Sequence, residues 1–301
     1  MPPSLLPGDT TGLRLWRHPA NGLSHHITEA PGPAGGPRGT VVLLHGYLDE
    51  ARSFTHLLQS LGGSGYRCLA PDLRGHGRSD WAPPGSYYHF PDYLADLDAL
   101  VRSLALGPVH LVAHSMGGSV ATRWAAVRPE GVRSLSLLEG VGPPSMPAEV
   151  AVDRTLAWLE ALARRASRPS RSMADLDEAL RRLRVSHASV DEAVLRAVAA
   201  YATQPAEEGG LRFRFDRLHQ TISPGRHDAE AFEHFIDRLT CPVLLVDGGD
   251  TSLWPDYEAR TGRFKAPGRV SLPGAGHMMH WTQPEALSGC VRAFLDGLPP
   301  G

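Results

Sequence analysis

The sequence predicts an α/β fold with a mostly parallel central sheet and one helical insertion, and two patterns predict it. Short runs rich in Val and Leu recur along the chain, and their nearly continuous apolar character is typical of strands buried on both faces of a parallel sheet. Helical patterns separate these runs, and such alternation indicates right-handed crossovers. The strand runs are TVVLLHG, YRCLAPDL, VHLVAHS, RSLSLLEG and CPVLLVDGG. A chain of 301 residues, 42% of them hydrophobic, can bury a core of this kind.

The elements follow one another in a simple order. LRLWRHPANGLSHHITEA has two short strand patterns on either side of Asn21 and Gly22, a pair that suits the positive φ angles of a type I′ hairpin turn. After a loop rich in Pro and Gly, strands and helices alternate. The predicted helices of this part are FTHLLQSL, YLADLDALVRSLAL and ATRWAAVRP, and EALSGCVRAFLDGL closes the chain.

One long section interrupts the alternation and predicts a helical cap. Between residues 143 and 236 we find no buried-strand run, and three segments instead repeat Leu, Val and Ala at helical spacing with Arg and Glu on the outer face. These segments are PAEVAVDRTLAWLEALARRA, MADLDEALRRLRVSH and SVDEAVLRAVAAYA. We therefore expect residues 1–142 and 237–301 to form the α/β core and residues 143–236 to form a cap inserted into it.

Composition excludes several classes of partner. The formal net charge is −2, so there is no basic excess to hold a nucleic acid or an anionic membrane surface. No run of about 18 uncharged apolar residues is present, and the N-terminal residues have no secretory-signal pattern. The three cysteines are far apart and lack metal-ligand spacing. We expect a cytoplasmic protein with no metal, no nucleic-acid partner and no membrane partner.

Ser115 is the candidate nucleophile. It ends the apolar run VHLVAH and precedes a helical pattern, with Ala113 two residues before it and Gly117 two residues after it. A tight strand-to-helix turn needs small residues at both places, and the nucleophile elbow G-x-S-x-G has glycine there. A serine that caps a helix N-terminus is the alternative. If Ser115 is the nucleophile, the backbone N–H of Met116 at the helix start is expected to be one oxyanion donor.

Two further features supply the other groups of an acyl-transfer site. The strand run TVVLLHG ends just before Tyr47, whose backbone N–H is expected to be the second oxyanion donor. His277 follows a strand and a loop of small residues and precedes the last helix, which is the place for a general base. His280 is the alternative base, three residues further on.

Two carboxylates are candidates for the acid that orients the histidine. Asp250 follows the run PVLLVDGG, although an aspartate there can also simply form a turn. Glu139 ends the run RSLSLLEG, where a carboxylate is costly to desolvate unless something pairs with it. Both strands end at the same edge of the sheet, so either side chain could reach His277.

The motifs HGYLDEARSF, PDLRGHGRSD and AHSMGG resemble those of the α/β-hydrolase superfamily, and the resemblance extends over nearly the whole chain. Within it they look like the serine hydrolase-like proteins and the group that contains bacterial esterases, haloalkane dehalogenases and epoxide hydrolases. The last two classes have an aspartate at the elbow. The resemblance with Ser115 at that position therefore implies hydrolysis through an acyl-enzyme.

The same resemblance bears on the triad acid. The superfamily pattern G-x-x-D-x-x-x-P, aligned on Gly248 and Pro255, places Thr251 at the acid position and Asp250 one residue early. Some dehalogenases have a Glu after the sixth strand, where this chain has Glu139. The resemblance therefore favours Glu139, and Asp250 stays as the alternative.

Together these features predict a serine hydrolase that cleaves a small or medium organic ester without a cofactor. We expect Tyr47, Leu48 and Trp158 to line the acyl pocket, with Phe213 and Phe215 as further apolar contacts. The alternative for Trp158, Phe213 and Phe215 is that they pack the cap helices against each other. The same triad could instead hydrolyse a C–C, amide or lactone bond, and a ligand-binding member of the fold without activity is a further alternative. A homodimer formed through the cap stays open.

Overall fold

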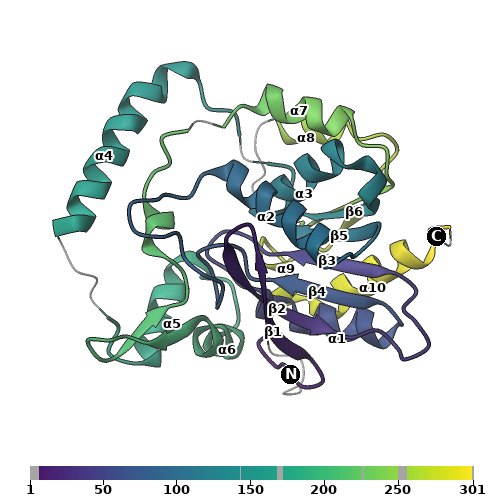
Figure 1. Ribbon diagram of the computed structural model, residues 1–301, viewed down its shortest axis with the longest axis horizontal. Coiled ribbons are helices and arrows are strands. Elements are labelled where there is room, and N and C mark those ends of the chain that lie inside the picture. Colours follow the sequence, from purple (N-terminus) through teal and green to yellow (C-terminus); the bar gives the residue numbers. More distant parts are fainter. Residues whose placement is uncertain (1–6, 143, 168–171, 226, 250–255, 300–301) are drawn as a thin grey trace.

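The computed structural model describes residues 7–142, 144–167, 172–225, 227–249 and 256–299, and its centre is an eight-stranded sheet (Figure 1). In spatial order the strands are β1 (Arg14–Ala20), β2 (Leu23–Ala30), β4 (Arg67–Pro71), β3 (Thr40–Leu44), β5 (Val109–His114), β6 (Val132–Leu138), β9 (Val243–Asp247) and β10 (Gly268–Ser271). Strand β2 is antiparallel to β1 and β4, and every other neighbouring pair is parallel. The mostly parallel sheet predicted from the apolar runs is confirmed.

The first two strands form the predicted hairpin. Ala20 pairs with Leu23, and the two residues between them, Asn21 and Gly22, have φ angles of 50° and 75°. Positive φ at both central positions is what a type I′ turn requires.

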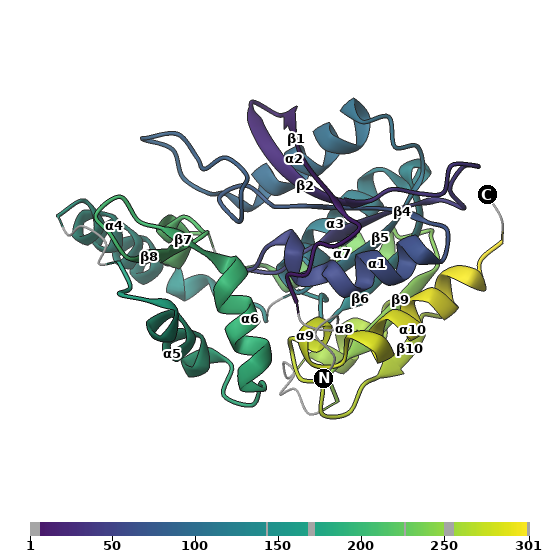
Figure 2. The ribbon, with the colours of Figure 1, turned by 90° about the horizontal axis from the view of Figure 1, so that it is seen from below.

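Helices cover both faces of the sheet, and each face has its own hydrophobic core (Figures 1 and 2). On one face lie α2 (Phe90–Ser103), α3 (Met116–Val127), α7 (Ala229–Asp237) and α8 (Tyr257–Thr261). On the other face lie η2 (Ala51–Phe54), α1 (Thr55–Gly63), α9 (Met279–Thr282) and α10 (Pro284–Asp296). The short η3 (Pro129–Gly131) leads into β6. Within the described ranges, no helix combines the length and the apolar character needed to cross a membrane.

Between β6 and α7 the chain leaves the sheet and forms what we call the cap, residues 144–225 apart from 168–171. Its elements are η4 (Ala148–Val150), α4 (Ala151–Ser167), α5 (Leu176–Ser186), α6 (Glu192–Ala202), β7 (Thr203–Pro205), β8 (Leu211–Phe213) and η5 (Arg217–Gln220). Helices α4, α5 and α6 stand to one side of the sheet, at the left of Figure 1. The predicted insertion also included α7, but Phe232 and Ile236 of α7 are buried in the core beside α3. Helix α7 therefore packs with the α/β core.

The cap contacts the core near the loop that carries His277. Val194 and Val198 of α6 pack in one cluster with Met278 and Trp281, which lie one and four residues after His277. His187, just after α5, lies edge-on to Trp281 with ring centroids 5.1 Å apart. The cap therefore covers the segment that holds the candidate base.

Candidate active site

Ser115 occupies a strained turn between β5 and α3. Its φ and ψ angles are 51° and −117°, and it is the N-cap residue of α3. A non-glycine residue rarely adopts positive φ, and such strain persists where the surrounding structure enforces it. Strand β5 lies between β3 and β6, and the Ser115 N–H donates to the Leu138 carbonyl of β6 at 3.1 Å. The turn is therefore fixed at the carboxyl edge of the sheet.

The small residues around Ser115 are required by close backbone contacts. A Cβ atom on Gly117 would lie 2.4 Å from the Leu44 carbonyl oxygen, and one on Gly118 would lie 2.5 Å from the Gly140 Cα atom. Helix α3 thus begins in direct backbone contact with the ends of two neighbouring strands. This is the physical reason for the glycines after Ser115, and it agrees with an elbow at this point.

The loop after β3 lies against the same serine. A Cβ atom on Gly46 would lie 3.2 Å from Ser115 Cβ, so the backbone before Tyr47 passes close to the candidate nucleophile. His45 is fully buried and fixes this loop, since its Nδ1 bonds the Gly46 carbonyl at 2.8 Å and its Nε2 accepts from the Leu73 N–H at 2.9 Å. In the described part of the chain, the N–H groups of Tyr47 and Met116 have no hydrogen-bond acceptor. Both are available to a ligand.

His277 and Glu139 are directly bonded. The distance from His277 Nδ1 to Glu139 Oε2 is 2.7 Å, and Glu139 Oε1 accepts from the Gly248 N–H at 2.8 Å. The Glu139 side chain is 3% exposed, whereas that of His277 is 46% exposed. A carboxylate bonded at Nδ1 holds the proton on that nitrogen and leaves Nε2 as the lone-pair nitrogen. The pair therefore has the arrangement that a general base and its orienting acid require.

The alternative acid cannot be compared with Glu139 in the same way. Asp250 lies outside the described residues, which end at Gly249 on that side and resume at Asp256. Glu139 itself follows β6 with a φ angle of 46°, a strained value for a non-glycine residue, and its N–H bonds the Val246 carbonyl of β9 at 3.0 Å. The Glu139 carboxylate is thus anchored between β6 and β9, next to the end of β5.

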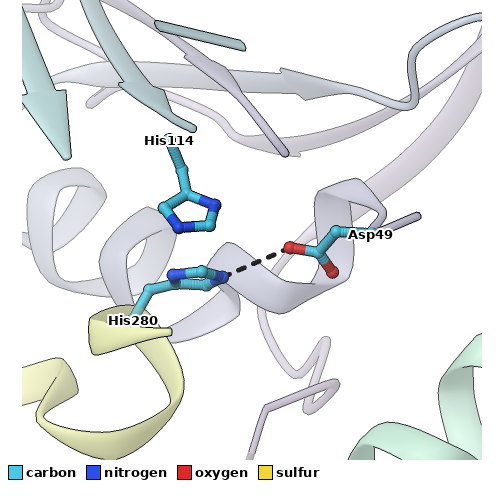
Figure 3. A group of neighbouring side chains, drawn as sticks. All are labelled: Asp49, His114 and His280. Carbon is cyan, nitrogen blue, oxygen red and sulfur yellow. Dashed lines mark hydrogen bonds and ion pairs between the residues drawn. The ribbon is translucent and has the colours of Figure 1, made fainter. Parts of the chain in front are cut away.

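His280 and Asp49 form a second imidazole–carboxylate pair, beside His114 (Figure 3). His280 Nε2 is 3.2 Å from Asp49 Oδ2, both side chains are buried, and the Ser53 hydroxyl donates to the same oxygen at 2.7 Å. The sequence offers His280 as an alternative base and indicates no role for Asp49. In the structure His280 is turned toward Asp49, and no local signal predicts this because the two residues are 231 positions apart.

His114 connects that pair to His277. Its ring centroid is 4.5 Å from that of His280 and 4.6 Å from that of His277. Burial, followed by the charges of His280 and His277, holds the pKa of His114 well below its usual range, so the ring is neutral. Its Nε2 is 2.8 Å from the His277 carbonyl oxygen, which can only accept, so Nε2 carries the proton. His114 therefore supports the backbone of the loop that holds the candidate base.

Asp49, His114 and His280 also form the one group in the described ranges whose side chains could hold a metal ion. Their ligand atoms lie within 4.8 Å of one another. The contacts that these residues make with each other and with His277 give them a structural role without an ion, and we derive no metal chemistry from them.

The predicted pocket residues are only partly brought together. Tyr47 is 50% exposed, and its hydroxyl donates to the His219 carbonyl of the cap at 2.6 Å. Trp158 of α4 lies edge-on to Tyr87 with ring centroids 5.5 Å apart. Burial first, and then the nearby Tyr87, raises the pKa of Tyr47. Phe213 and Phe215 stack on each other at 5.4 Å. Lining of an acyl pocket by Tyr47, Leu48 and Trp158 stays a prediction.

Fold and comparisons together define the class of protein. The chain belongs to the alpha/beta hydrolase fold family, whose model matches residues 39–284. It is 39% identical over 277 residues to a serine hydrolase-like protein of Danio rerio, covering 86% of this chain and 82% of that protein. It is 29% identical over 272 residues to an esterase of Mycobacterium tuberculosis, covering 87% and 84%. Among solved structures, a hypothetical protein of Pseudomonas aeruginosa is similar with a TM-score of 0.84 and 27% identity, over 94% of this chain and 99% of that one. The predicted superfamily is confirmed.

Proposed function

We propose that this protein is a serine hydrolase that cleaves ester bonds of small or medium organic acyl substrates through an acyl-enzyme. The single observation that carries the proposal is the 2.7 Å contact between His277 Nδ1 and the buried Glu139 carboxylate, at the sheet edge where Ser115 follows β5. The similarity to an esterase supports the choice of bond.

In the proposed mechanism Ser115 Oγ attacks the substrate carbonyl while His277 Nε2 takes its proton. Glu139 keeps the His277 proton on Nδ1 and stabilises the imidazolium that forms. The Tyr47 and Met116 N–H groups donate to the oxyanion, and each such donor contributes about 3 kcal/mol in mutational precedent. His277 then returns the proton to the leaving alcohol. In the second half His277 takes a proton from a water molecule that attacks the acyl-enzyme, and it returns that proton to the Ser115 oxygen as the acid is released.

The test is hydrolysis of p-nitrophenyl esters from acetate to laurate, with Ser115→Ala beside the wild type. We expect turnover in the wild type and a loss of at least about 10³-fold in the variant. Ser119→Ala is the matched control, because Ser119 lies on the same helix four residues further on and is buried. Its turnover should stay within about threefold of wild type. Equal turnover by the Ser115→Ala variant would overturn the serine mechanism.

A second readout does not depend on the substrate. A fluorophosphonate probe should add one phosphonyl group to the wild type and to Ser119→Ala, and none to Ser115→Ala, as judged by intact mass. Labelling without ester turnover would move the proposal to C–C, amide or lactone hydrolysis on the same residues. Neither labelling nor turnover by a folded protein would leave a ligand-binding role.

The finer expectations from the sequence belong to the same proposal. They are a small-molecule acyl substrate, an acyl pocket closed by the cap, a cytoplasmic location, and no nucleic-acid or membrane partner. The chain-length optimum of the ester series measures the pocket, and replacing Trp158 by Ala should shift that optimum toward longer acyl chains.

A further inference from the structure

A cavity lies on the hairpin side of the molecule, and the cap and the core both contribute to it. Its volume is about 480 Å³, and it opens where strand β1, residues 77–81 of the core and the β7–β8 hairpin of the cap meet. Arg17 and Arg78 line it from the core, and Arg212 and Arg214 line it from the cap. We call it the arginine pocket. None of Ser115, His277 and Glu139 is among its lining residues.

The arginine pocket has an excess of positive charge. The single acidic residue among its lining residues is Asp80, which forms an ion pair with Arg17. Arg78 has one carboxylate neighbour at 3.4 Å, Glu50, which Arg52 also binds, at 2.7 Å. A third carboxylate, the buried Asp72, also acts on Arg78 and Arg214 through its charge, but it pairs with His26 at 3.0 Å and forms no ion pair with either arginine in the described ranges. In the described part of the chain, Arg212 and Arg214 have no carboxylate within ion-pair distance.

The two cap arginines have unused hydrogen-bonding capacity. Arg214 donates to the Tyr201 carbonyl at 3.1 Å and to the Gln204 side-chain oxygen at 3.0 Å, both of them uncharged acceptors. The Arg212 guanidinium lies over the Trp81 ring, 5.2 Å from its centroid, and its Nε atom is buried without an acceptor in the described residues. A buried N–H without an acceptor is costly, and a guanidinium fork matches the oxygens of a phosphate or a carboxylate.

The like charges repel each other across the arginine pocket. Burial first, and then the charge of Arg78, lowers the pKa of the Arg214 guanidinium. Burial and the charge of Arg52 likewise lower the pKa of Arg78. Burial and the charge of Asp72 raise the pKa of Glu50 to about 7, so this carboxylate offsets the arginines only in part near neutral pH. An anion seated between the guanidinium groups would relieve this repulsion.

We propose that the arginine pocket binds the dianionic phosphate group of an organic phosphate monoester, separately from the ester-hydrolysing site. The two guanidinium charges without carboxylate partners match the charge of one phosphate monoester near pH 7.5. A cavity of about 480 Å³ exceeds the size of a phosphate group and falls in the range of small-molecule sites. The Trp81 ring offers a surface for the organic part. The bound phosphate joins the cap, through Arg212 and Arg214, to the core, through Arg17 and Arg78.

Calorimetric titration of the full chain with phenyl phosphate, inorganic phosphate and benzoate, at pH 7.5 and constant ionic strength, tests the proposal. We expect phenyl phosphate to bind with a Kd below about 1 mM, and benzoate to bind at least about tenfold more weakly. Inorganic phosphate should bind about fivefold more weakly than phenyl phosphate, because it makes no contact with Trp81. Equal affinity for inorganic and phenyl phosphate would overturn the organic part of the proposal. No binding of either by the wild type would overturn it altogether.

Matched variants locate the site. Arg212→Gln and Arg214→Gln should each weaken phenyl phosphate binding at least about tenfold. Arg217→Gln is the control, because Arg217 is an exposed arginine three positions further on that does not line the pocket, and its affinity should equal that of the wild type. The melting temperature without ligand shows that each variant folds. Arg212→Lys keeps the charge and loses the fork, so its affinity should be intermediate. Unchanged affinity in both glutamine variants would overturn the assignment.

Discussion

Replacement of Glu139 by Gln changes one oxygen of the predicted triad into an NH₂ group, and the structure dictates which one. Glu139 Oε1 accepts from the Gly248 backbone N–H, and Oε2 faces His277 Nδ1. A backbone N–H can only donate, so in the Glu139→Gln variant the amide oxygen must face Gly248 and the NH₂ group must face His277. The imidazole would then accept at Nδ1 and carry its proton on Nε2. That tautomer cannot take the serine proton.

The size of the effect follows from the same distance. A carboxylate and an imidazolium 2.7 Å apart attract each other by about 6 kcal/mol at an effective dielectric constant of about 20. Water screens part of this attraction because His277 is 46% exposed, so we expect the interaction to stabilise the imidazolium by about 3 to 6 kcal/mol. Each 1.36 kcal/mol of transition-state stabilisation is a factor of ten in rate. The kcat should therefore fall by about 10² to 10⁴, and the corresponding change in a serine protease lies at the upper end of that range.

The assay is kcat on p-nitrophenyl acetate between pH 6 and 9, with melting followed by circular dichroism to show that the variant folds. Asp250→Asn is the matched carboxylate control, and its kcat should stay within about threefold of wild type. A folded Glu139→Gln enzyme that keeps more than about a tenth of the wild-type kcat would refute the reasoning. Loss of kcat in Asp250→Asn alone would transfer the role to Asp250.

Three further predictions concern stability. Gly117→Ala should lower the free energy of unfolding, measured in urea, by more than about 2 kcal/mol, because its Cβ would lie 2.4 Å from the Leu44 carbonyl oxygen. The control is Gly289→Ala on α10, where a Cβ meets open space, and it should be neutral or stabilising. Equal effects of the two substitutions would contradict the predicted clash at Gly117. Burial lowers the pKa of His219 to about 4, so this residue stabilises the native state above pH 6.5 and loses that effect as the pH falls toward 4. When the pH falls from 7 to 4.5, the free energy of unfolding of the His219→Phe variant should therefore decrease by about 2 to 3 kcal/mol less than that of the wild type. An identical decrease in the two proteins would argue against a lowered pKa of His219. Phe232→Ala should cost about 3 to 5 kcal/mol, since the fully buried Phe232 ring joins α7 to the core, and a cost below 1 kcal/mol would show that α7 is not fixed there.

The features that the sequence predicted well are those with local causes. The turn at Asn21 and Gly22 needs positive φ at two adjacent positions, and this pair of residues supplies it. The position of Ser115 follows from a buried strand, a helix and small residues within about ten positions, and the structure places it at a strand-to-helix turn as expected. Parallel strands, being buried on both faces, also have a clear signature.

Contacts between distant segments were not predictable in the same way. The pairing of Asp49 with His280 and the meeting of Arg17 with Arg212 depend on how helices and the cap pack, and no spacing rule connects such residues. The predicted cap boundary had the same weakness. Helix α7 is amphipathic like the cap helices, and amphipathicity does not tell which surface covers the apolar face. For the acid, the sequence could place Glu139 at the right edge of the sheet, but its 2.7 Å distance to His277 depends on how the loop after β10 packs against that edge.

At position 115 the backbone conformation favours glycine, whereas the proposed reaction needs the serine hydroxyl. The φ and ψ angles of 51° and −117° cost a residue with a Cβ atom about 1 to 3 kcal/mol, whereas glycine adopts positive φ freely. A chain with glycine at this position would be expected to be more resistant to unfolding and would have no hydroxyl to attack a carbonyl. Stability alone would therefore favour glycine at position 115, and the strain at Ser115 has a purpose only if its hydroxyl is used, as the proposed function requires.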